Sequence, residues 1–121
     1  MEFNNNLPIY IQVMEKIKQD IVTKKLELGE KMPSSRDYAN KLGINFNTVA
    51  RVYKELEMEE ILFTKRGLGT FITEDPIRID NLRYEMAKTQ IDTFIRGMKQ
   101  IGYTKEDMMK FIEMQDNNLE V

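Results

Sequence analysis

Residues 34–58 decide the fold, and they read SSRDYANKLGINFNTVARVYKELEM. Ser34, followed three residues later by Asp37, predicts a capped helix start, and Gly43 suits the left-handed residue that often ends a helix. Asn45 is a good N-cap for a second helix that runs to the end of the stretch. Because only a glycine and an isoleucine separate the two helices, the stretch predicts a helix-turn-helix.

The second of these helices has two chemically different faces. Its apolar side chains fall at helical spacing on one face: Val49, Val52, Tyr53 and Leu56. The opposite face carries Asn47, Ala50, Arg51 and Lys54. A recognition helix in the major groove of DNA needs this division, because one face packs into the domain while the other presents hydrogen-bonding groups to base edges.

The flanking residues predict the rest of a winged helix-turn-helix. Upstream, apolar residues recur at helical spacing from Pro8 to about Thr23, on a stripe that includes Tyr10; residues 26–32 then favour a loop or short extended piece. Downstream, residues 61–64 and 70–73 read as β-strands joined by a glycine-bearing tip with two cations. The predicted fold class is therefore mainly α with a small β-hairpin wing.

Composition argues against an enzyme. The 121 residues contain neither histidine nor cysteine, which removes the commonest general base, the thiolate nucleophile and the commonest metal ligands. We therefore expect no catalytic site, metal or cofactor. The sequence holds no apolar run of about 20 residues and no signal layout at its start, so we expect a cytoplasmic protein with no membrane segment.

The total charge does not favour nucleic acid. The net charge is −2, and residues 1–75 hold 11 basic and 12 acidic residues. Affinity for DNA leans on Lys and Arg that meet phosphates, so the placement of charge has to decide. The acidic residues of the predicted recognition helix lie toward its C-terminal end, whereas the cations lie on its polar face and at the hairpin tip.

Residues 76–121 form a tail that begins at Asp75-Pro76. Its pattern predicts one helix ending near Gly102 and a last helix capped by Thr104 and Asp107. Two helices are too few to enclose a core alone, so we expect residues 76–121 to need a partner to finish burying their apolar surface, with the tail methionines in core or dimer packing.

Four short stretches share their order with a known family: PIY (8–10), LGEKMPSSR (28–36), LGI (42–44) and GLGTF (67–71). Through them, residues 7–75 resemble the DNA-binding domain of the GntR family of bacterial regulators. NFNTVARVY (45–53) and the short tail resemble its YtrA-type subfamily, whose tail is a dimerisation element. The resemblance implies a homodimer on an inverted-repeat operator in double-stranded DNA, usually repressing, and often near genes for ATP-binding-cassette transporters.

Chemistry and resemblance together give the candidate DNA-binding residues: Ser35, Arg36, Asn45, Phe46, Asn47, Thr48, Arg51, Lys54, Lys65, Arg66, Gly67, Gly69 and Thr70. Amide and guanidinium groups can read adenine and guanine, and the cations can also hold phosphate. Phe46 and Glu60 depart from the family pattern. Phe46 could pack on a thymine methyl or fill the turn, and Glu60 is strained if its backbone is left-handed.

Two alternatives stay open. The acidic composition allows a winged-helix protein-interaction module that does not bind DNA. A regulator whose tail binds a small-molecule effector is also possible, but its pocket would have to form between subunits because the tail is short.

Overall fold

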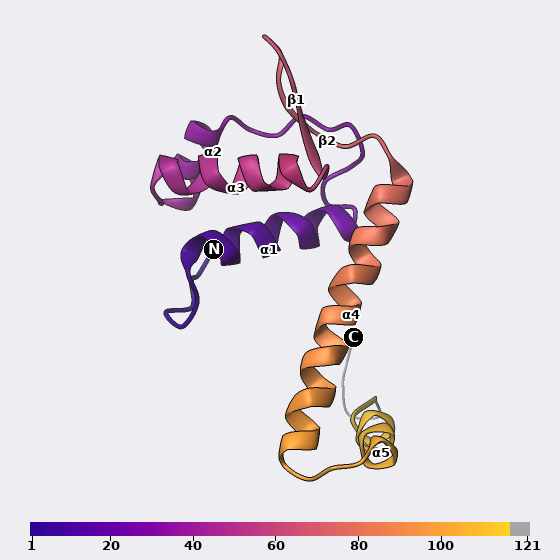
Figure 1. Ribbon diagram of the computed structural model, residues 1–121. Helices are drawn as coiled ribbons and strands as arrows, with labels where there is room; N and C mark the ends of the chain where they lie inside the picture. The colour runs from indigo at the N-terminus through magenta and orange to yellow at the C-terminus, as the bar shows by residue number, and fades with distance from the viewer. Residues whose placement is uncertain (117–121) are drawn as a thin grey trace. The chain divides into compact units, whose positions relative to one another are not determined.

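The computed structural model describes residues 1–116 (Figure 1). In chain order its elements are α1 (Ile9–Val22), α2 (Ser35–Leu42), α3 (Phe46–Met58), β1 (Leu62–Lys65), β2 (Gly69–Ile72), α4 (Pro76–Gln100) and α5 (Lys105–Asp116). The chain divides into two compact units, Met1–Arg83 and a tail unit that begins at Tyr84. The predicted fold class, a winged helix-turn-helix followed by a helical segment, is confirmed.

Helix α1 begins directly after Pro8 and packs against α3. Its fully packed face carries Val13, Ile17 and Ile21, each at most 3% exposed. The stripe predicted from the sequence is therefore displaced at its start, because Tyr10 is only half-buried. This displacement leaves the face of the Tyr10 ring available to a neighbour.

The helix-turn-helix forms through the caps that the sequence predicts. The Ser34 hydroxyl accepts a hydrogen bond from the Asp37 amide at 3.1 Å. Gly43 has a φ of 69° and ends α2 in the left-handed conformation. The side chain of Asn45 accepts from the Asn47 amide at 2.7 Å and starts α3. Because these bonds are local, the turn between α2 and α3 is fixed by its own residues.

The hairpin β1–β2 is antiparallel, with Lys65 opposite Gly69, and rises from the end of the unit where α3 stops (Figure 1). Both strands lie one residue closer to the hairpin tip than the predicted ranges 61–64 and 70–73. The pairing of Lys65 with Gly69 extends the antiparallel ladder toward the tip. Residues 30–32, within the segment expected as a loop or extended piece, form backbone hydrogen bonds with β2 and so add a third extended segment to the wing. Met32 donates to the Thr70 carbonyl at 2.8 Å, and the Ile72 amide donates to the Glu30 carbonyl at 2.9 Å.

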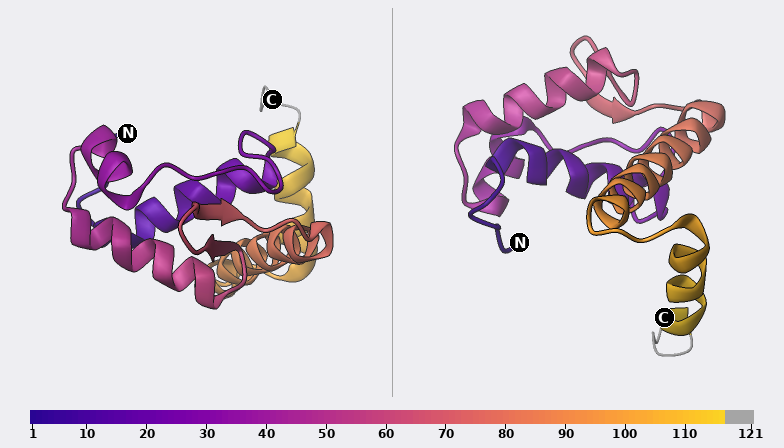
Figure 2. Two further views of the ribbon diagram at one scale, coloured as in Figure 1. Left: turned by 90° about the horizontal axis from the view of Figure 1, so that it is seen from above. Right: turned by 60° about the horizontal axis from the view of Figure 1, so that its bottom comes forward.

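The first unit encloses an aliphatic core between its helices and the hairpin, whose ribbons Figure 2 shows from two further directions. Its largest fully buried side chains are Ile17, Leu56, Ile61, Leu62, Ile72 and Leu82, with Val13, Val49 and Val52. Leu82 comes from α4. The predicted boundary at Asp75-Pro76 coincides with the start of α4, whereas the compact unit continues to Arg83. None of the helices in residues 1–116 is long and apolar enough to cross a membrane.

The tail unit has a different character. Thr104 and Asp107 cap α5 reciprocally: the Thr104 amide donates to the Asp107 carboxylate at 2.9 Å, and the Asp107 amide donates to the Thr104 hydroxyl at 3.2 Å. The predicted capping box is thus confirmed. Hydrogen bonds from Thr104 lower the pKa of Asp107. Within residues 84–116, Met108 is the one buried hydrophobic side chain.

Candidate nucleic-acid interface

Helix α3 presents an exposed polar face opposite its buried one. Asn47, Arg51 and Lys54 are exposed on it, and Thr48 is half-buried in the first turn. Val49, Val52, Tyr53 and Leu56 are buried on the other side. The division predicted from the sequence is therefore present, and three hydrogen-bonding side chains share one accessible face.

Arg51 is held by two neighbours. Its guanidinium carbon lies 3.8 Å from the centroid of the Tyr10 ring, which comes from α1. Its Nε donates to the Glu55 carboxylate one turn along α3 at 3.2 Å. The Arg51 side chain is still 57% exposed, so both contacts leave it open to solvent. The helical pattern predicted Tyr10 on the apolar stripe of α1, but the structure places its ring against the Arg51 guanidinium.

Arg36 and Phe46 form a second pair of cation and ring. The Arg36 guanidinium carbon, on α2, lies 4.7 Å from the centroid of the Phe46 ring on α3. Phe46 is 39% exposed. The aromatic residue that departs from the family pattern therefore supports a cation across the turn, and it still presents part of its surface to solvent.

The wing carries a third such arrangement. The Lys65 ammonium lies 4.9 Å from the centroid of Phe71 and 5.5 Å from that of Phe63. These two rings stack across the strands with centroids 5.8 Å apart. Arg66 and Gly67 are exposed in the turn that follows. The hairpin tip thus carries two cations: Lys65, which lies near the two aromatic rings, and Arg66, which is exposed in the turn.

Gly69 and Lys31 meet where the wing approaches α2. Gly69 has a φ of 120°, and a Cβ there would lie 2.9 Å from Cε of Lys31, so the lysine stem passes directly over the glycine. Lys31, Ser35 and Thr70 line one open hollow beside the start of α2. Sequence reasoning did not include Lys31 or Tyr10 among the candidates. Both lie in the stretches that carry the family resemblance, which was the available signal.

Asn45 and Tyr53 fix the geometry behind this surface. The Asn45 side-chain oxygen accepts the helix-capping bond, and the amino group of the same side chain is a donor for another partner. The buried Tyr53 hydroxyl donates to the Pro33 carbonyl at 2.7 Å. Burial raises the pKa of Tyr53 far above its ordinary value, so the hydroxyl keeps its proton and this bond between α3 and the start of α2.

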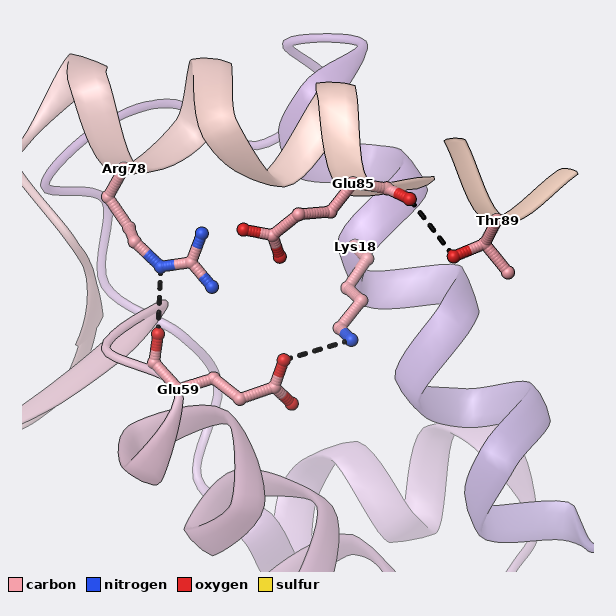
Figure 3. A network of polar contacts seen from close by, with 5 residues as sticks. All are labelled: Lys18, Glu59, Arg78, Glu85 and Thr89. Carbon is pink, nitrogen blue, oxygen red and sulfur yellow. Dashed lines mark hydrogen bonds and ion pairs between the residues drawn. The ribbon is translucent and has the colours of Figure 1, made fainter. Parts of the chain in front are cut away.

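The acidic residues at the end of α3 are engaged by neighbours. Glu55 pairs with Arg51, and Glu57 accepts from the Thr64 hydroxyl. Glu59 pairs with Lys18 of α1 at 3.2 Å, and its backbone carbonyl accepts from Nε of Arg78 on α4 at 2.8 Å (Figure 3). Two of the carboxylates next to the polar face, Glu55 and Glu59, are therefore paired with cations of the protein.

A helix-turn-helix with an exposed polar recognition face and a basic hairpin defines a winged-helix DNA-binding protein. The family model described as bacterial regulatory proteins, gntR family, matches residues 9–72. The chain therefore belongs to the GntR family and is a DNA-binding transcriptional regulator, from a family of regulators rather than of enzymes.

Similar proteins agree with this assignment. The chain is 33% identical to the HTH-type transcriptional repressor YtrA of Bacillus subtilis (strain 168) over 110 residues, which cover 90% of this chain and 85% of YtrA. A GntR family transcriptional regulator from Listeria monocytogenes has a solved structure with a TM-score of 0.88 and 39% identity, covering 93% of this chain and 98% of that chain. The predicted resemblance to YtrA-type regulators is confirmed.

Solved structures similar to part of this chain include complexes with operator DNA. The structure of AraR(DBD) in complex with operator ORX1 has a TM-score of 0.53 and 28% identity, and the match covers 55% of this chain and 81% of that chain.

Proposed function

We propose that this regulator is a repressor that binds an inverted-repeat operator in double-stranded DNA as a homodimer. The observation that carries the proposal is the gathering of exposed cations on α3, on α2 and at the hairpin tip, although the chain is acidic overall. The likeness of about half of this chain to a domain solved on its operator supports DNA as the partner of this surface. YtrA, which is named a repressor, supports the direction of regulation.

The proposal gives each candidate residue a role. Asn47 and Arg51 read base edges in the major groove, with Lys54 and Phe46 beside them. The remaining residues hold the sugar-phosphate backbone and set the register: Ser35, Arg36, Asn45, Thr48, Lys65, Arg66, Gly67, Gly69 and Thr70. Exposure of the α3 side chains and the aromatic support under the cations favour this division of roles.

Residues 76–121 supply the dimer contact in this proposal, and residues 7–75 supply the DNA-binding domain. The exposed apolar side chains of the tail favour the dimer: Tyr84, Ile91, Ile101, Met109, Ile112 and Met114. Two recognition helices about 34–36 Å apart, or a multiple of that distance, would enter successive major grooves on one side of the operator. If an effector exists, the regulator binds it between the subunits.

Selection of DNA from random-sequence duplexes by the purified protein, repeated at two salt concentrations, tests the proposal. We expect an inverted repeat whose affinity falls steeply with salt, because phosphate contacts release counterions. The absence of any enriched sequence would overturn the proposal and favour the protein-interaction module.

Two variants then separate the proposed roles. Arg51→Ala should weaken binding to the selected operator by about 1–3 kcal/mol and lower its preference over random duplex. Lys65→Ala should weaken both duplexes alike and reduce the salt slope by about one unit or less. Equal loss on both duplexes for Arg51→Ala would rule out base reading by that residue.

A further inference from the structure

Tyr10 lies outside the helix-turn-helix and the wing, yet it contacts Arg51, one of the two residues proposed to read base edges. Its ring is half-buried at the start of α1, and the Arg51 guanidinium carbon lies 3.8 Å from the ring centroid. This is the shortest of the cation-to-ring distances found in residues 1–116. The ring therefore does more than fill space between α1 and α3.

An unsupported arginine on an exposed helix face samples many rotamers, and ordering it on binding costs free energy. In this protein two contacts restrict that freedom before DNA arrives. The Tyr10 ring covers one face of the guanidinium, and Glu55 accepts from Nε at 3.2 Å. The side chain is thus held from two directions.

Both contacts spare the groups that recognition needs. The Tyr10 ring covers the guanidinium, and Glu55 accepts the hydrogen bond that Nε donates, so the two terminal amino groups keep their donors for an acceptor outside the protein. A guanine edge or a phosphate accepts from such a fork. With 57% of the Arg51 side chain exposed, those donors are accessible.

We propose that Tyr10 is a positioning residue for DNA recognition, whose ring holds the Arg51 guanidinium ready to contact DNA. The inference rests on the function proposed above for Arg51. It extends the recognition apparatus to α1, a helix whose other role is to pack against α3 through its buried aliphatic face. Arg36 on Phe46 and Lys65 on Phe71 follow the same principle within the helix-turn-helix and the wing.

A double-mutant cycle on DNA binding tests the role. Affinity for the operator recovered by selection, and for random-sequence duplex, is measured for the wild type, Tyr10→Leu, Arg51→Ala and the double variant. Tyr10→Leu should weaken operator binding about two- to fivefold, the range of an exposed cation–π contact, and should change random-duplex binding less. In the Arg51→Ala background, Tyr10→Leu should have no further effect.

Two further variants control for simple loss of packing. Tyr10→Phe keeps the ring and should restore binding close to the wild type. Met14→Ala shortens a half-buried apolar side chain one turn further along α1, keeps both Tyr10 and Arg51, and should leave the preference for operator over random duplex unchanged. An equal effect of Tyr10→Leu in both backgrounds would overturn the positioning role, since a purely structural residue acts regardless of Arg51.

A measurement on the free protein separates failure of this inference from failure of the proposed function. The Nε–H resonance of Arg51 should carry a ring-current shift that Tyr10→Leu abolishes and Tyr10→Phe retains. Operator selection with no coupling between the two residues would overturn the role of Tyr10 alone. No selection by the wild type would overturn the proposed function together with the recognition role, and an intact ring-current shift would then mark the contact as structural.

Discussion

The two units of this regulator solve the problem of apolar burial differently. The first unit closes its own core, with Ile17, Leu56 and Ile61 fully buried between helices and hairpin. In the tail unit the described residues bury only Met108, while Ile91 and Ile112 are about half exposed. The first unit therefore has the core of an independent folding unit, whereas the tail leaves apolar surface exposed, which the homodimer proposed above would cover.

This difference separates two kinds of stability. Stability of the first unit should be a property of one chain and independent of protein concentration. Assembly through the tail should depend on concentration, because mass action controls any association between chains. Substitutions in the two units should accordingly have distinct signatures.

Leu56→Ala should produce the largest effect. Leu56 is fully buried at the end of α3, so its truncation should lower the free energy of unfolding by about 2–5 kcal/mol. Urea unfolding followed by circular dichroism checks this value. Met58→Ala, on the same helix but at a side chain 75% exposed, is the matched control and should change stability little. Similar losses for both variants would contradict the closed core.

Ile91→Asp should act on assembly and leave the first unit folded. A carboxylate placed in an apolar contact between chains must be desolvated, so we expect dimer dissociation to become about tenfold easier or more. Sedimentation over a range of concentrations measures it. Thr93→Asp, an exposed polar position two residues along the same helix, is the control. An unchanged dimer in Ile91→Asp would exclude this part of α4 from the interface.

Glu60→Gly should stabilise the first unit by about 0.5–1 kcal/mol. Glu60 has a φ of 62°, so its backbone is left-handed, the condition under which the sequence predicts strain there, and glycine adopts this region without a Cβ clash. The shift in melting temperature measures the gain. Met58→Gly, at the last residue of α3 two positions earlier, should instead be destabilising, and a loss of stability in both variants would argue that Glu60 carries no strain.

Asp107 should give α5 a small dependence on pH. Its pKa is lowered by hydrogen bonds from Thr104, so the ionised form favours the folded helix. The contribution is complete above the ordinary carboxyl pKa and is lost as the pH falls below about 4 toward the lowered value. Amide resonances of the first turn of α5 should report fraying in that range. Asp107→Asn should remove this dependence, and a wild-type turn that stays unchanged through the titration would contradict it.

Local chemistry explains how far the sequence alone could predict this fold. The caps at Ser34, Gly43 and Asn45, and the box of Thr104 and Asp107, depend on residues at most four positions apart. The pairing of residues 30–32 with the wing could not be predicted, because their backbone hydrogen bonds go to β2, some 40 residues later in the chain. The extent of the first unit into α4 was equally hidden, since Leu82 is buried only by tertiary packing.

The candidate interface shows the same limit. Exposure of Asn47, Arg51 and Lys54 could be predicted from helical spacing alone. The support that Tyr10 gives to Arg51 joins residues 41 positions apart, and the crossing of Lys31 over Gly69 joins a strand-like segment to the wing. Neither contact has a local sequence signal, because each depends on how separate elements meet.

The hydrogen bond from Arg78 to the Glu59 carbonyl affects where the DNA-binding unit of one regulator can be joined to the tail of another. It satisfies a backbone acceptor at the end of the recognition helix with a side chain from the first turns of α4, and Leu82 fills the core from the same segment. A chimaera that exchanges tails at Pro76 would remove both groups from the DNA-binding unit. A junction placed after Arg83 would preserve them, so the unit of modular exchange in this chain includes the root of the tail helix.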